Sequence, residues 1–169
     1  MIHGFPPIAG EDARVLILGT VPSEMSLQKG QYYGNPRNAF WPIVESLFAG
    51  GRQLGYPERV ALVQASGVAI WDVLEAADRT GSLDGHITKP VPNDIPSFLR
   101  DRPAIRSVFF NGAKAEQLLL EHVEPTLATA MRRDISFVRL PSTSPANARL
   151  PFTQKLAAWR RVRDEAAVD

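Results

Sequence analysis

The sequence of 169 residues contains no cysteine, and its hydrophobic runs are no longer than a strand. Without cysteine the protein has no disulfide bond, no thiolate nucleophile and no cysteine-ligated zinc or iron–sulfur site, which fits a reducing cytoplasm. Runs of strand length predict that no helix spans a membrane. The N-terminus has neither a basic start nor an apolar segment, so we expect no signal peptide and a cytoplasmic protein.

Motifs of several common enzyme classes are also missing. The three histidines, His3, His86 and His122, are far apart and lack the spacing of a metal site, and the phosphate loops GxxxxGK[ST] and GxGxxG do not occur. The formal net charge is only +1. A surface that binds nucleic acid would therefore be a local patch and not the whole protein.

Short apolar runs alternate with amphipathic segments along the chain. The runs predict strands at Val15–Leu18, Gly67–Val73, Ser107–Phe110 and Phe137–Leu140. Helical spacing and helix-breaking residues predict helices at Asn38–Phe48, Tyr56–Ser66, Ile95–Arg102, Ala113–His122 and Thr153–Glu165. Prolines predict a loop over Leu83–Pro96. The alternation is typical of a mostly parallel sheet with both faces covered, in a single domain over residues 1–169.

The segment from Gly19 to Trp41, GTVPSEMSLQKGQYYGNPRNAFW, is predicted to be a long loop after the first strand. Loops of this length in a compact domain are usually functional or disordered. This one is rich in aromatic residues and low in charge, which argues against disorder. Its adjacent tyrosines and two asparagines are suited to stacking on a flat heterocycle and hydrogen-bonding its edges.

Polar residues follow the other strands too. Asp72 lies at the end of the second predicted strand, Asn111 follows the third, and the segment PSTSPANA begins at Pro141 after the fourth. Ligands of open α/β sheets bind beyond the carboxyl ends of the strands. We therefore expect the segments at these ends to meet at one site.

The two segments GTVPSEMSL…YYGNPRNAFW and LPSTSPANA resemble the signature motifs of the hypoxanthine-DNA glycosylase (DNA-deoxyinosine glycosylase) branch of the uracil-DNA glycosylase superfamily. The opening GFPPI, Asp72 and the segment FFNG at 109–112 are similar as well, so the resemblance covers nearly the whole chain. It implies a three-layer α/β/α sandwich with a central, mostly parallel four-stranded sheet. It also implies hydrolysis of the N-glycosidic bond of a deaminated base, with no metal and no cofactor.

The chemistry of this reaction agrees with the residues present. The enzyme must flip the base out of DNA into a pocket. Breaking the bond leaves a cationic, oxocarbenium-like sugar and an anionic base, so the pocket needs a group that holds water and donors that stabilise the departing charge. Hypoxanthine in DNA is the expected substrate and uracil a second one. We expect a monomer, because the DNA substrate is itself large.

Two residues are the predicted catalytic groups. The resemblance places Val21 where mismatch-specific relatives carry the asparagine that positions water, and valine cannot hold water. Asn38, in the NPRNAFW segment, takes over that role in our prediction, although an asparagine here could also cap the following helix. Asp72 could orient water or accept a hydrogen bond from the N1–H of hypoxanthine. A cap after the strand is the alternative for Asp72.

Further residues are predicted to bind the base or the DNA strand. The base-binding set consists of Tyr33 as the stacking ring, Asn35, Val21 and Asn111, while turn formation is the alternative for both asparagines. Hydroxyls and backbone N–H groups commonly contact phosphates. On that basis, the loop predicted to enter the minor groove, together with one serine of the first motif, gives the DNA-binding set Ser23, Ser142, Thr143, Ser144, Pro145 and Asn147.

These observations predict a DNA repair glycosylase. The alternative is a non-catalytic protein that binds a nucleotide or a damaged base on the same fold, and Val21 is the residue that favours it. A nucleotide-metabolising enzyme is a third option, against which the missing glycine-rich phosphate loop counts. Fold alone would not choose among these functions.

Overall fold

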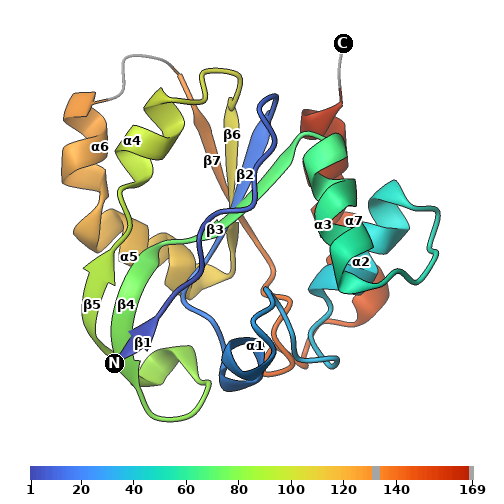
Figure 1. The fold of residues 1–169 in the computed structure, drawn as a ribbon, viewed down its shortest axis with the longest axis horizontal. Helices are drawn as coiled ribbons and strands as arrows, with labels where there is room; N and C mark the ends of the chain where they lie inside the picture. Colours follow the sequence, from blue (N-terminus) through green and yellow to red (C-terminus); the bar gives the residue numbers. More distant parts are fainter. Residues whose placement is uncertain (131–133, 168–169) are drawn as a thin grey trace.

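Four parallel strands form the central sheet of the protein (Figure 1). The computed structural model describes residues 1–130 and 134–167. The sheet has the order β3-β2-β6-β7, and the strands are β2 (Val15–Gly19), β3 (Val68–Asp72), β6 (Ser107–Asn111) and β7 (Ser136–Leu140). Every pairing between neighbouring strands is parallel. The predicted α/β class with a four-stranded parallel sheet is confirmed.

The central strands are apolar because both faces of the sheet are covered. Side chains alternate along β2: Val15 and Ile17 enter one core cluster, whereas Leu16 and Leu18 enter the other. Helices form the outer two layers, and Figure 1 shows them on both sides of the sheet. The first side carries α2 (Phe40–Phe48), α3 (Tyr56–Ala65) and α7 (Phe152–Ala166). The second side carries α4 (Ile95–Arg100), α5 (Ala113–His122) and α6 (Glu124–Ala130).

A second, antiparallel sheet was not predicted. It has the order β1-β4-β5, and its strands are β1 (Ile2–His3), β4 (Leu74–Arg79) and β5 (Ile87–Pro92). The predicted loop over Leu83–Pro96 is therefore wrong, because it contains β5 and the short 3₁₀ helix η1 (Asp84–His86). Pro90 and Pro92 are tolerated since β5 is an edge strand, which does not need every N–H for pairing.

The loop predicted from Gly19 to Trp41 also contains regular structure. Helix α1 (Glu24–Lys29) lies within it, capped by the Ser23 side chain at its start. Helix α2 begins at Phe40, two residues later than predicted, and α6 was not predicted. None of the described helices combines the length and the apolar character needed to cross a bilayer.

Candidate active site

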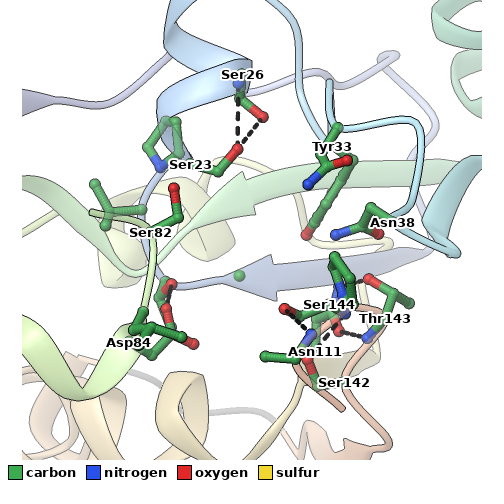
Figure 2. A pocket seen from close by; sticks show the side chains of 18 of the residues that line it. Ser23, Ser26, Tyr33, Asn38, Ser82, Asp84, Asn111, Ser142, Thr143 and Ser144 are labelled. Carbon is green, nitrogen blue, oxygen red and sulfur yellow. Dashed lines mark hydrogen bonds between the residues drawn. The ribbon is translucent and has the colours of Figure 1, made fainter. Parts of the chain in front are cut away.

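The carboxyl ends of the parallel strands open into a cavity of about 520 Å³ (Figure 2). Segments after β2, β3, β6 and β7 all contribute to it, as the predicted convergence requires. The cavity is lined by every residue predicted for the site: Val21, Ser23, Tyr33, Asn35, Asn38, Asp72, Asn111, Ser142, Thr143, Ser144, Pro145 and Asn147. This arrangement brings the predicted residues together, while their individual roles remain predictions.

Gly19 makes room for two of these side chains. A Cβ atom at this position would lie 2.6 Å from Asp72 Oδ1 and 2.9 Å from the Tyr33 hydroxyl, closer than atoms can approach without moving. The last residue of β2 therefore has to be glycine for the carboxyl and the hydroxyl to occupy their places. Asp72 and Tyr33 are thus packed beside the same backbone atom, where β2 ends.

The carboxyl group of Asp72 is in an unusual environment for an acid. The residue is only 5% exposed. Burial, together with the negative charge of Asp84, raises the pKa of Asp72 from 3.8 to about 7 against the opposing charge of Arg79. Among the described residues, no side chain or backbone N–H donates a hydrogen bond to this carboxyl. A carboxyl that titrates near neutral pH can both accept and release a proton under working conditions.

Tyr33 has a strained backbone and a buried hydroxyl. Its φ angle is +52°, in the left-handed region that bulky residues avoid. Its ring stacks on that of Phe40, with centroids 3.9 Å apart and planes 19° from parallel. Within the described chain, its hydroxyl is the one buried side-chain polar atom without a hydrogen-bond partner. Burial raises the pKa of Tyr33, so the hydroxyl keeps its proton and remains a donor.

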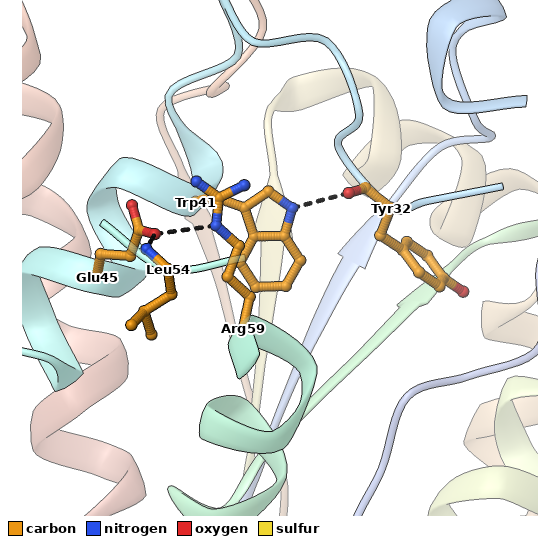
Figure 3. Close-up of polar contacts among 5 residues, drawn as sticks. All are labelled: Tyr32, Trp41, Glu45, Leu54 and Arg59. Atoms are coloured by element: carbon orange, nitrogen blue, oxygen red, sulfur yellow. Dashed lines mark hydrogen bonds and ion pairs between the residues drawn. The ribbon is translucent and has the colours of Figure 1, made fainter. Parts of the chain in front are cut away.

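The backbone before Tyr33 is held by side chains from two helices, and Figure 3 shows the contact from Trp41. The Trp41 indole N–H donates to the Tyr32 carbonyl at 2.8 Å, and the Tyr32 N–H donates to the Tyr56 hydroxyl at 3.0 Å. The Tyr32 hydroxyl donates to the carbonyl of Pro6 at 2.9 Å. These contacts fix both peptide groups of Tyr32, which is the support that a strained neighbouring residue requires.

Trp41 is itself held by an ion pair in which Glu45 is buried and Arg59 is partly exposed. The Arg59 guanidinium lies over the Trp41 ring, 5.7 Å from its centroid. Arg59 Nε contacts Glu45 Oε2 at 2.9 Å, and the same oxygen accepts the Leu54 N–H at 2.7 Å (Figure 3). Trp41 and Glu45 are 2% and 5% exposed. Phe40 and Trp41 are both buried and begin the core-facing side of α2.

Two cavity asparagines use their amide oxygens to shape the chain. Asn38 Oδ1 accepts the Phe40 N–H at 2.9 Å, so Asn38 bonds the first residue of α2 from just before the N-cap position, which Ala39 occupies. Asn35 Oδ1 accepts the Arg37 N–H at 2.9 Å and forms a turn. Because a backbone N–H needs an acceptor, each bond also identifies which amide atom is oxygen. The Nδ2 groups of both residues are left as donors on the cavity wall.

Asn111 joins the two sequence motifs. Its Oδ1 accepts the Thr143 N–H and its Nδ2 donates to Thr143 Oγ1, both at 2.9 Å. The Thr143 carbonyl in turn accepts the Ala39 N–H at 3.0 Å, just before α2. Both ends of the Asn111 amide are thus occupied, which favours holding the loop over contacting a base. Thr143 is 1% exposed and serves this junction.

The loop after β7 is shaped by its own side chains. Ser142 Oγ accepts the Ser144 N–H, Ser144 Oγ accepts the Ala146 N–H, and Asn147 Nδ2 donates to the Ser142 carbonyl. The hydroxyl protons of Ser142 and Ser144 stay available to an acceptor such as a phosphate oxygen. Ser23 differs, since its hydroxyl accepts the Ser26 N–H and donates to Ser26 Oγ. This favours a structural role for Ser23.

The β4–β5 hairpin adds residues that the sequence did not reveal. Asp84 and Arg79 line the same cavity, and Thr20 Oγ1 donates to Asp84 Oδ1 at 2.9 Å. Arg79 is tethered by the carbonyls of Gly81 and Pro22, each at 2.6 Å. The only signal in the sequence was one aspartate, Asp84, within the predicted loop Leu83–Pro96, while Arg79 lies in a stretch for which no element was predicted. In the described part of the chain, no three histidine or acidic side chains gather as a metal site.

Comparison with known proteins identifies the family. A profile of the uracil DNA glycosylase superfamily matches residues 6–163. The chain is 36% identical over 163 residues to "Hypoxanthine DNA glycosylase" of Methanosarcina acetivorans, covering 95% of this chain and 96% of that one. It is 37% identical over 115 residues to the protein of the same name from Methanosarcina barkeri, covering 67% and 72%.

A solved structure is similar along almost its whole length. It is a solution NMR structure of a candidate uracil DNA glycosylase from Methanosarcina acetivorans, with a TM-score of 0.76 and 32% sequence identity. The match covers 95% of this chain and 97% of the other. The family profile, the two relatives and the solved structure all point to the same family. The chain therefore belongs to the uracil DNA glycosylase superfamily.

Proposed function

We propose that this protein is a monofunctional DNA glycosylase that removes hypoxanthine, and secondarily uracil, from DNA. The observation that supports it most directly is the set of groups left free in the cavity. Asn35 and Asn38 offer amide donors, and Asp72 and Asp84 offer carboxyl oxygens. A deaminated base presents a carbonyl beside a ring N–H, which pairs with one donor and one acceptor.

The ring of Tyr33 supplies the stacking surface in this proposal. One face of the ring is covered by Phe40 at 3.9 Å, so a flipped base would stack on the other. The strained backbone that holds the ring in place is typical of functional sites. The serine hydroxyls of the loop after β7 would contact the phosphates of the same strand.

The catalytic step follows from Asp72 and Asn38. As the N-glycosidic bond breaks, its electron pair stays with the base, and water forms the new bond to C1′ of the sugar. Asp72, whose pKa lies near 7, takes the proton of that water and faces the cationic sugar. The Asn38 amide oxygen already accepts the Phe40 N–H, so Asn38 acts as a donor to the water oxygen or to the anionic base.

No observation favours the non-catalytic alternative. Val21 is buried in the cavity wall, and a polar residue at that position is not needed when Asp72 lies beside Gly19. That the enzyme works as a monomer, in the cytoplasm and without a cofactor belongs to the same proposal.

A glycosylase assay tests the proposal. Labelled duplexes carrying one hypoxanthine, uracil, xanthine or thymine mismatch are incubated with enzyme, and alkali then cleaves the strand at the abasic product. We expect cleavage at hypoxanthine without added metal, strongly reduced in Asp72→Asn. Asp78→Asn, which changes an aspartate of β4 outside the cavity, is the matched control and should cleave normally. Binding to damaged duplexes without cleavage of any lesion would favour the non-catalytic protein.

A further inference from the structure

The hydrogen bonds of the cavity restrict how a substrate N–H can be recognised. The amide oxygens of Asn35, Asn38 and Asn111 each already accept a backbone N–H. Asn147 donates its Nδ2–H to the Ser142 carbonyl, so among the described residues its amide oxygen is the one of the four that accepts no backbone N–H, but it belongs to the loop after β7. The acidic acceptors among the described cavity residues are the carboxyl groups of Asp72 and Asp84.

Asp84 is held more firmly than Asp72. Thr20 Oγ1 donates to Asp84 Oδ1 at 2.9 Å, which fixes the carboxyl and leaves Oδ2 without a protein donor among the described residues. Figure 2 shows Asp84 on the side of the cavity opposite Asn38. A base stacked on Tyr33 would thus have amide donors along one side and this carboxyl on the other.

The surroundings of Asp84 differ from those of Asp72. Burial raises the pKa of Asp84, while the Thr20 hydrogen bond and the charges of Arg79 and Lys114 oppose that rise. Asp72 has no hydrogen-bond donor among the described residues, and of the charges around it only Arg79 opposes the rise in its pKa. Near neutral pH Asp72 therefore exchanges a proton, as its proposed catalytic role requires, whereas the Asp84 carboxyl differs in accepting a hydrogen bond from Thr20.

We propose that Asp84 is the specificity residue that accepts the ring N–H of the flipped base and so distinguishes a deaminated base from its parent. Hypoxanthine and uracil carry this N–H next to a carbonyl, whereas adenine and cytosine carry a bare nitrogen lone pair there. A fixed carboxylate binds the first and repels the second, which is discrimination by an unfavourable contact. This inference rests on the proposed glycosylase function and assigns base selection to the β4–β5 hairpin.

The test measures binding separately from cleavage. Duplexes carry a 2′-fluoro nucleotide of hypoxanthine or of adenine at one position, since the fluorine prevents loss of the base by destabilising the cationic sugar. We expect the wild type to prefer the hypoxanthine duplex. In Asp84→Asn the preference should fall by about 10- to 100-fold, the range for one hydrogen bond to a charged group.

Three further variants separate the possible causes. Thr20→Val, which removes the hydroxyl that fixes Asp84, should reduce the preference less, and it covers the case in which Asp84→Asn fails to fold. Asp78→Asn should leave the preference unchanged. Asp72→Asn should keep the preference in binding but lose cleavage of the unmodified hypoxanthine duplex.

The outcomes distinguish the two proposals. An unchanged preference in Asp84→Asn, a preference lost in Asp72→Asn, or no preference in the wild type would each overturn the role of Asp84. A wild type that prefers hypoxanthine in binding through Asp84 but never cleaves the unmodified duplex would overturn the glycosylase function and leave the role of Asp84 intact.

Discussion

The indole N–H of Trp41 donates a 2.8 Å hydrogen bond to the carbonyl of Tyr32, one residue before the strained Tyr33 (Figure 3). Trp41 belongs to α2, and the Arg59 guanidinium that packs over its ring belongs to α3. The position of the proposed stacking ring therefore depends on two helices that do not contribute to the chemistry. A left-handed tyrosine costs roughly 1–2 kcal/mol, so without such support the loop would relax.

Replacing Trp41 by phenylalanine tests this support. Trp41→Phe keeps an aromatic ring in the core but leaves the Tyr32 carbonyl without its donor, and we expect a loss of about 1–3 kcal/mol in the free energy of unfolding. Urea denaturation measures the loss. Single-turnover cleavage should slow while the affinity for undamaged DNA stays the same. Tyr56→Phe removes the bond on the other side of Tyr32 and should act similarly. Lower stability with a full cleavage rate would contradict the link to Tyr33.

The backbone conformation of Tyr33 makes a separate prediction. At most positions glycine is less stabilising than alanine, by roughly 0.5–1 kcal/mol in regular elements. At φ +52° the glycine variant should be the more stable of the two, because alanine is strained in the left-handed region and glycine is not. Tyr33→Gly should therefore be more stable to urea than Tyr33→Ala, although both lose the stack on Phe40. Gln31, which lacks a positive φ, is the control position, where alanine should be the more stable variant.

The central sheet could be predicted because its strands are buried on both faces and form uninterrupted apolar runs such as Val15–Leu18. The antiparallel hairpin could not. Its strand β4 contains Ala76 and Ala77 instead of β-branched residues, and β5 contains Pro90 and Pro92. Alanine and proline are unfavourable in strands, and only the edge position of β5 makes the prolines acceptable.

The candidate site was partly predictable for the same reason. Parallel topology brings the strand ends together, so Asp72 and Asn111 could be expected to meet the first motif. How the asparagines use their amides could not be expected. Whether Asn38 or Asn111 is free depends on which backbone N–H groups lack a partner, and that is decided by the tertiary contacts of Ala39, Phe40 and Thr143.

Asp72 should make stability depend on pH. Its pKa is about 7 in the folded protein, whereas an unfolded chain ionises an aspartate near 4. Between these values the folded state keeps a proton that the unfolded state has lost, so the free energy of unfolding falls as pH rises and levels off above about 7. Across this window the free energy of unfolding falls by about 4 kcal/mol.

Urea denaturation of wild type and Asp72→Asn from pH 4 to pH 8 measures this fall in the free energy of unfolding. The stability of Asp72→Asn relative to the wild type should increase with pH across the window. Asp94 should have the opposite effect on the pH dependence of stability, because hydrogen bonds from Ser97 lower its pKa. Asp94→Asn should lose stability at neutral pH, and the loss should disappear as pH falls below the ordinary pKa of an aspartate. A constant difference between Asp72→Asn and the wild type would contradict the raised pKa.

In the proposed mechanism the Asn38 amide oxygen accepts the Phe40 N–H and its amide N–H donates to the water or the leaving base. Two substitutions separate these roles. Asn38→Asp keeps an oxygen that can accept the Phe40 N–H but offers no N–H donor, whereas Asn38→Ala removes both. Loss of the hydrogen bond to the Phe40 N–H should lower the stability of Asn38→Ala by about 1 kcal/mol, while Asn38→Asp stays close to the wild type. Because both lose the donor to the water or the leaving base, cleavage should fall in both by roughly 10²–10³-fold.

Thermal or urea unfolding and single-turnover cleavage of hypoxanthine DNA, measured on the same preparations, distinguish the two jobs of Asn38. A stable Asn38→Asp that cleaves as slowly as Asn38→Ala assigns the loss to the missing donor, since the hydrogen bond to the Phe40 N–H is intact in one variant and absent in the other. A stable Asn38→Asp that cleaves at the wild-type rate would show that Asn38 serves only to start α2. In that case Asp72 would be the one group of the predicted catalytic pair that acts on the bond.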